Sequence, residues 1–200
     1  RSKGGGLYWL HPGFASRQRL VKKVLILPAR IEMMKATFRG VETKLEDEER
    51  VSKEVTDLVL RQFQRRGFQA ILEDSQASDS HDSQRKYRLA DLHNRYDELF
   101  RLMKLVPRDI ERGRYSLGSE VADYAAARTD ALVFIRGVGS KGVACNVGLV
   151  DAKSGDVLLS IQTGLVGPGL LFGKVPSGFK KVSGLEKPIG DALRRVPLAN

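Results

Sequence analysis

The segment EDEERVSKEVTDLVLRQFQRRG, residues 46–67, decides the fold class. Its apolar residues recur at the spacing of one helical face, namely Val51, Val55, Leu58, Val59 and Phe63. Acidic residues 46–49 come first and two arginines come last, and both placements are favourable for the helix dipole. Gly67 is expected to end the helix, because glycine adopts the left-handed conformation at little cost.

Short apolar runs on both sides of this helix predict strands. LVKKVLILPARIEM (20–33) is expected to form one strand with residues 25–27 as its buried centre, and Pro28 fits a strand end or edge. A polar connection is expected between this strand and the helix. FQAILED (68–74) predicts the strand that follows the helix.

A second helix is predicted from an apolar heptad stripe, formed by Leu89, Leu92, Tyr96, Leu99, Met103 and Val106. The stripe is too short to favour a coiled coil, so we expect it to pack on the domain's own core. Pro107 should end it. A small-residue helix is expected within residues 115–130, and a final helix starting near Lys187 would place Pro188 in its first position.

The segment FIRGVGSKGVACNV (134–147) contains Gly137-x-Gly139-x-x-Gly142, the spacing of a dinucleotide-binding fingerprint. That fingerprint requires a helix N-terminus after the glycines, and here a strand pattern follows instead. We therefore predict a turn between antiparallel strands. The alternative is an anion contact in which Lys141 assists a glycine-rich nest.

The segment VACNVGLVDAKSGDVLLSIQTG (143–164) predicts a hairpin around DAKSGD, where Asp151 can bond to the turn backbone and Gly155 supplies a positive φ. The predicted order is strand, helix, strand, helix, helix, strand, hairpin, helix. This order indicates an α/β fold, a mixed sheet with helices packed on it. We expect a leader or tether at 1–19 and a single domain at 20–200, with a Gly/Pro-rich arm at 165–181.

The chain of 200 residues has a formal charge of +10, which favours anionic partners. Its cations are scattered over RQRLVKK (17–23), RQFQRRGF (61–68), QRKYR (84–88) and GFKK (178–181). Several of these segments lie in amphipathic patterns, where long cations usually form a solvated face. A basic nucleic-acid-binding module is therefore the alternative function.

The sequence predicts no catalytic, cofactor or metal site. His81 and His93 are twelve residues apart without a third ligand at metal spacing, and His93 is expected at the surface, one step beyond Leu92. Cys145, the single cysteine, fits a small buried strand residue. A further alternative is an enzyme that uses His93 with Asp91 or Asp97.

Two parts of the chain resemble a known group of envelope proteins. KVLILPARIEMMKA (23–36) with the helix and RRGFQAILED (65–74) is similar to the opening of domains related to the TolB N-terminal domain, as in the lipoproteins CsgG and LpoB. RTDALVFIRGVG (128–139) with VGLVDAKSGDVLLS (147–160) is similar to their later half. The resemblance implies a non-enzymatic periplasmic scaffold without a cofactor.

The resemblance also implies anchoring to the outer membrane through an N-terminal lipid. The chain begins with Arg1 and lacks the lipid-bearing cysteine, which we expect a processed or truncated N-terminus to explain. Docking to envelope proteins or self-association is the expected mode of action. Exposed apolar residues mark such interfaces. Besides the heptad stripe, the candidates are Tyr8, Trp9, Leu10 and Phe14 in the leader, and Leu170, Leu171, Phe172 and Phe179 in the arm.

Overall fold

The computed structural model describes residues 7–37, 40–43, 45–73, 82–125, 128–140, 142–164 and 181–197. The strands are β1 (Leu7–Leu10), β2 (Lys23–Ile26), β3 (Arg30–Thr37), β4 (Gly40–Thr43), β5 (Gln69–Leu72), β6 (Ala131–Gly139), β7 (Val143–Asp151) and β8 (Val157–Thr163). The α-helices are α1 (Pro12–Ala15), α2 (Leu45–Arg66), α3 (Asp82–Leu105), α4 (Val121–Ala125) and α5 (Glu186–Leu193), and the 3-10 helices are η1 (Pro107–Arg112) and η3 (Val182–Leu185).

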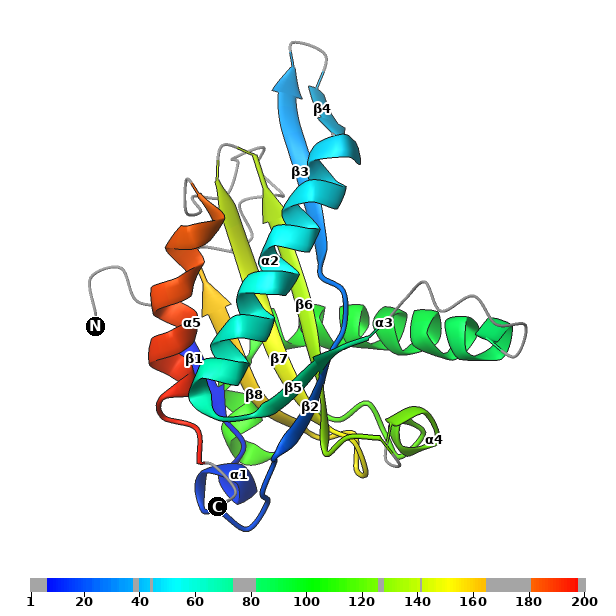
Figure 1. Ribbon diagram of the computed structural model, residues 1–200, viewed down its shortest axis with the longest axis vertical. Coiled ribbons are helices and arrows are strands. Elements are labelled where there is room, and N and C mark those ends of the chain that lie inside the picture. The colour runs from blue at the N-terminus through cyan, green and yellow to red at the C-terminus, as the bar shows by residue number, and fades with distance from the viewer. Residues whose placement is uncertain are drawn as a thin grey trace.

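These elements form a mixed sheet with helices on both faces, so the predicted α/β class is confirmed (Figure 1). The strand order is β1-β8-β7-β6-β2-β5, and β3 pairs with both β6 and β4. β2 and β3 both run parallel to β6, with Val24 opposite Ala131 and Arg30 opposite Arg136. The segment predicted as one strand is therefore two, and the break contains Pro28, which has no N–H for a ladder bond.

The connection predicted as polar contains strands that the prediction did not include. β3 continues to Thr37 and pairs antiparallel with β4, so a hairpin stands before α2. In Figure 1 this hairpin extends beyond the rest of the sheet. The sequence does carry a signal for it, because apolar Met34, Ala36 and Phe38 alternate with polar Lys35, Thr37 and Arg39, and the prediction did not use it.

Two apolar cores lie on opposite faces of the sheet. α2, η3 and α5 cover one face, and α3, η1 and α4 cover the other. The side chains of β2 alternate between the two cores, with Val24 and Ile26 facing α2 and Leu25 facing α3. A strand covered on both faces carries consecutive apolar residues, which explains the run VLIL.

The two long helices agree with their predicted faces. The predicted apolar face of α2 is buried, and Gly67 follows the helix with φ of 103°. On α3, Leu92, Tyr96 and Met103 are buried on the domain's own core, as expected. Val106, the last residue of the stripe, lies beyond the helix and is exposed.

Both predicted turns between antiparallel strands are confirmed. β6 and β7 are paired up to Gly139 and Val143, and no helix follows the glycines, so the dinucleotide-binding interpretation is excluded. At the β7–β8 turn, Asp151 Oδ1 accepts hydrogen bonds from the backbone N–H groups of Lys153 and Ser154, each at 2.8 Å. Gly155 has φ of 75°, the left-handed conformation expected there.

The N-terminal segment belongs to the sheet from Leu7 onward, although we expected a leader through residue 19. β1 pairs antiparallel with β8, and Phe14 of α1 is fully buried in the core. At the other end, α5 begins at Glu186, one residue before the expected start, so Pro188 is third. A proline is tolerated there because the first N–H groups of a helix have no partner within it. Residues 165–180 of the predicted arm lie outside the described residues.

Candidate functional site

A buried arginine stands out on β6. Arg136 follows the apolar run ALVFI and is only 6% exposed. A buried guanidinium is costly unless hydrogen bonds and a counter-charge compensate it. The partners of Arg136 therefore define the first candidate site.

The Arg136 network, consisting of Arg30, His93, Asp97 and Arg136, connects β3 and β6 to α3. Arg136 Nε donates to Asp97, and Nη2 donates to His93 Nδ1 at 2.7 Å and to the His93 carbonyl at 3.1 Å. Nη1 donates to the Ile135 carbonyl at 3.0 Å, and Arg30 lies 3.6 Å from Asp97. The guanidinium is thus satisfied, and it fastens α3 to the sheet.

His93 is buried, so the prediction of a surface position is wrong. Burial, followed by the charges of Arg136 and Arg30, lowers the pKa of His93 to about 3. An arginine only donates hydrogen bonds, so Nδ1 must accept and the ring proton resides on Nε2. The imidazole is therefore neutral, and its basic nitrogen is already occupied.

A second polar chain lies beside this network. Tyr96 Oη donates to Asn146 Oδ1 at 2.9 Å, and Asn146 Nδ2 donates to Ser160 Oγ at 2.7 Å. The Tyr96 ring stacks on Phe134 with centroids 4.3 Å apart, and burial raises its pKa. The Tyr96 chain links α3 to β7 and β8, and its fully buried hydroxyl has a partner.

In the structure, His93 and Asp97 do not form the catalytic pair that the sequence offered as an alternative. The Asp97 carboxylate is held by Arg136 and Arg30, while His93 faces Arg136. Cys145 is buried, which raises the pKa of its thiol to about 11, and its Sγ lies 3.3 Å from Thr163 Oγ1. Among the described residues no three His, Cys, Asp or Glu side chains gather as metal ligands.

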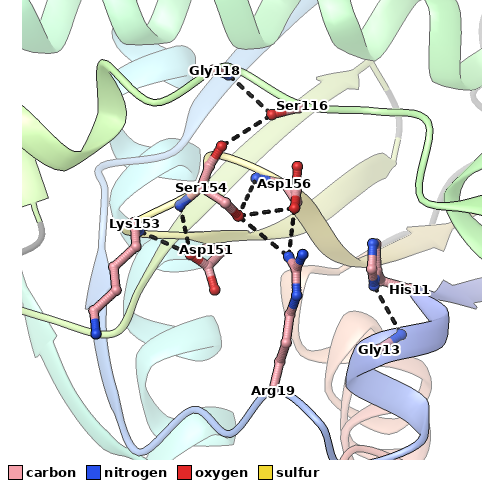
Figure 2. Close-up of polar contacts among 9 residues, drawn as sticks. All are labelled: His11, Gly13, Arg19, Ser116, Gly118, Asp151, Lys153, Ser154 and Asp156. Atoms are coloured by element: carbon pink, nitrogen blue, oxygen red, sulfur yellow. Dashed lines mark hydrogen bonds and ion pairs between the residues drawn. The ribbon is translucent and has the colours of Figure 1, made fainter.

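A third polar cluster joins the N-terminal segment to the β7–β8 turn (Figure 2). Arg19 Nη1 donates to Asp156 Oδ2 at 2.5 Å and to Ser154 Oγ at 3.2 Å. Burial raises the pKa of Asp156, but the hydrogen bonds from Arg19, Ser154 and Ser116 outweigh it and lower the pKa overall. This cluster joins segments far apart in the chain, and its charges compensate one another.

His11 lies in the same region, at the start of α1. Its Nδ1 accepts a hydrogen bond from the Gly13 N–H at 3.0 Å and so caps α1. Burial, then the charge of Arg19, lowers the pKa of His11. As in the Arg136 network, the imidazole has a structural role (Figure 2).

The structure places the predicted interaction residues in different surroundings. Tyr8, Trp9 and Leu10 are half-buried residues of β1, and the Arg195 guanidinium lies 6.0 Å from the Tyr8 ring. Phe14 is inside the core, which corrects the expectation that it is exposed. The arm residues Leu170, Leu171, Phe172 and Phe179, and the proposed anion contact Lys141, lie outside the described residues.

Two open grooves lie elsewhere on the surface, and no residue of the polar clusters lines them. One, of about 440 Å³, lies beside the glycine turn and is lined by Arg50, Glu54 and Lys181, among others. Arg50 is already paired with Asp47 and Glu54, so its charge is not available to an anion, and Lys181 is the remaining cation of the lining. The other, of about 520 Å³, lies between α2 and α5, where Arg65 pairs with Glu186.

Acidification is expected to destabilise the fold through His93. Because its folded pKa of about 3 is below the ordinary 6.5, the unfolded chain binds the proton first. The His93 contribution to the free energy of unfolding is complete above pH 6.5 and should fall by about 3 kcal/mol between there and about pH 4. Urea titrations across this pH range measure the loss.

His93→Gln is the matched variant, because its amide oxygen can still accept from Arg136 but does not titrate. Its stability should depend less steeply on pH than that of the wild type. His11, whose pKa is also lowered, contributes with the same sign, so His11→Asn serves as the second variant. Equal slopes for wild type and His93→Gln would contradict a buried neutral His93.

The fold and the polar clusters together define the class of protein: an α/β domain with helices on both faces of a mixed sheet, whose buried polar groups hold its layers together.

No family model matches the chain, and no curated protein matches it. Two solved structures are similar in fold. A PelC dodecamer from Paraburkholderia phytofirmans has a TM-score of 0.46 and 9% identity over 98% of both chains. A single-substitution variant of that dodecamer has a TM-score of 0.43 and 10% identity over 96% of this chain and 98% of that chain. Identities this low do not transfer the role of any residue.

Proposed function

We propose that this chain is a non-enzymatic component of a bacterial envelope complex that associates with copies of itself through the open edge of its sheet at β5. The envelope setting, in the periplasm with a lipid anchor at the outer membrane, rests on the sequence resemblance described above. The structural support comes from the surface of β5. The buried ionisable groups add to it, because their hydrogen bonds suit a rigid framework more than a reacting site.

The exposed apolar side chains of β5 carry the proposal. β5 ends the strand order and pairs with β2; within the described part of the chain no strand pairs with its outer side. Ile71 is 53% exposed and Leu72 is 43% exposed. An uncovered edge strand offers backbone groups to a further strand, and apolar side chains there favour association. β1 lies at the opposite edge, where again no strand among the described residues pairs with its outer side, and it carries the exposed Leu7.

Two arginines of the basic segment 61–68 form contacts within the domain, which weakens the support for the nucleic-acid alternative. Arg65 pairs with Glu186, and Arg66 donates to the carbonyls of Leu193 and Val196, each at 2.8 Å. These side chains fasten α5 to α2 and are not free to follow a phosphate backbone. Nucleic-acid binding stays a prediction for the other basic segments.

Ile71→Lys is expected to reduce the assembly to monomers, because a lysine on an edge strand opposes the addition of another strand. Size-exclusion chromatography with light scattering, at low and at high salt, measures the mass. Leu20→Lys is the control, since Leu20 is similarly exposed but lies in a loop. A wild type that is monomeric at both salt concentrations would contradict the proposal. An Ile71→Lys variant with the same oligomeric mass as the wild type would contradict it too.

A further inference from the structure

The end of α3 exposes an apolar patch. Leu102, Leu105 and Val106 are 54%, 78% and 48% exposed. Leu102 and Leu105 are three residues apart on the last turn of α3 and therefore lie on one side of it, and Val106 follows directly after the helix end. Met103, on another side, is buried against the core, so the helix is firmly docked while this side remains uncovered. We refer to these three residues as the α3 apolar patch.

Exposed cations adjoin the α3 apolar patch in the sequence. Arg101, Lys104 and Arg108 are exposed, and within the described ranges no carboxylate lies at ion-pair distance from them. The Lys104 ammonium lies 5.0 Å from the Phe100 ring. Two further arginines of this segment, Arg112 and Arg114, are both paired with Asp109. The segment 98–114 holds five cations against three carboxylates, the latter being Glu98, Asp109 and Glu111.

The combination of aliphatic side chains with unpaired cations favours the surface of an anionic bilayer as the partner. Apolar side chains inserted at a bilayer surface, with Lys and Arg at the headgroups, are the recognised pattern of interfacial binding. Nucleic acid fits less well, because leucine and valine offer no ring on which bases can stack. A second copy of the same patch fits less well too, because its cations would face cations.

We propose that the α3 apolar patch inserts into the surface of an anionic bilayer, with Arg101, Lys104 and Arg108 at the level of the lipid phosphates. None of the described helices is long and apolar enough to cross a bilayer, so the contact is one of surface docking. The proposal goes beyond the proposed function and does not depend on self-association. It orients the molecule with the face covered by α3 toward the membrane.

Vesicle sedimentation of the intact chain tests the proposal. Vesicles of phosphatidylcholine alone are compared with vesicles that contain one third phosphatidylglycerol. The charge of +10 alone attracts the chain to anionic vesicles, so the decisive variant leaves the charge unchanged. Leu102→Gln with Leu105→Gln should weaken binding to anionic vesicles about tenfold or more, because two leucine side chains no longer transfer from water into the bilayer. Leu45→Gln, at an exposed leucine of α2, is the matched control and should bind as the wild type does.

The outcomes separate the possible partners. Arg101→Gln with Arg108→Gln should weaken binding to the anionic vesicles and reduce its dependence on salt. Anionic-vesicle binding that the double leucine variant leaves unchanged would overturn the proposal. Two other results would also overturn the proposal, because they would assign the patch to another partner. One is a changed molecular mass of the double leucine variant, and the other is a loss of nucleic-acid binding in this variant without a loss of vesicle binding. A monomeric wild type would contradict only the proposed function.

Discussion

Gly148→Ala is expected to lower the free energy of unfolding by about 3 to 5 kcal/mol, the combined cost of overpacking and of a broken buried hydrogen bond. A Cβ on Gly148 would lie 2.7 Å from Tyr96 Cζ and still closer to the hydroxyl oxygen. Tyr96 cannot move aside easily, because it is fully buried, stacked on Phe134 and bonded to Asn146. Urea unfolding followed by circular dichroism measures the loss.

Two comparisons show whether the effect comes from Tyr96. Gly139→Ala would place its Cβ 2.5 Å from Met33 Sδ and 3.0 Å from the Gly142 carbonyl oxygen. The flexible methionine can adjust and the turn has to give only slightly, so we expect a loss of about 1 kcal/mol. Tyr96→Phe removes the atom nearest to the new methyl group. It should therefore cost less in the Gly148→Ala background than in the wild type, which a double-mutant cycle measures. A Gly148→Ala variant as stable as the wild type would show that Tyr96 does not lie over Gly148.

Arg136→Met is expected to cost about 3 to 5 kcal/mol, the usual penalty for removing one partner of a buried ion pair. Methionine fills similar space, but His93 Nδ1 loses its hydrogen-bond donor and Asp97 loses its nearer cation. The free energy of unfolding at neutral pH gives the size of the effect. Because the Arg136 charge also lowers the pKa of His93, that pKa should rise in the variant, which NMR titration measures.

The second substitution His93→Leu tests this explanation, because it removes the nitrogen that Arg136→Met leaves without a donor. The double variant should lose less than the sum of the two single variants. Asp97→Asn, at a carboxylate that is 34% exposed, should have a smaller effect than Arg136→Met. An Arg136→Met variant with unchanged stability and an unchanged His93 titration would contradict the network.

The elements predicted correctly are those whose signals lie within a few neighbouring residues. The apolar spacing of α2 and the glycine after it act along one helix, and the DAKSGD turn is held by Asp151 and Gly155 within the turn itself. Such patterns do not depend on what lies across the sheet. The α/β class followed because these local elements alternate along the chain.

The missed features depend on contacts between distant segments. β1 has only four residues, and its place is fixed by β8 near the other end of the chain. His93 lies beside the apolar stripe of α3, but its burial depends on Arg136 of β6. A charged residue directly after the buried run ALVFI was the available signal, since such a residue requires a partner from a neighbouring layer.

The pairing of β1 with β8 also affects the order in which the chain folds. Leu7 lies opposite Gln162. β2 likewise pairs with β6, although the two strands are far apart in the sequence. Contacts between residues so distant slow folding, because a long loop must close before they form. During synthesis, the first strand has to wait until almost the whole domain has left the ribosome. Until then β1 has no partner strand, and the nascent chain depends on rapid pairing once β8 has emerged to avoid aggregation.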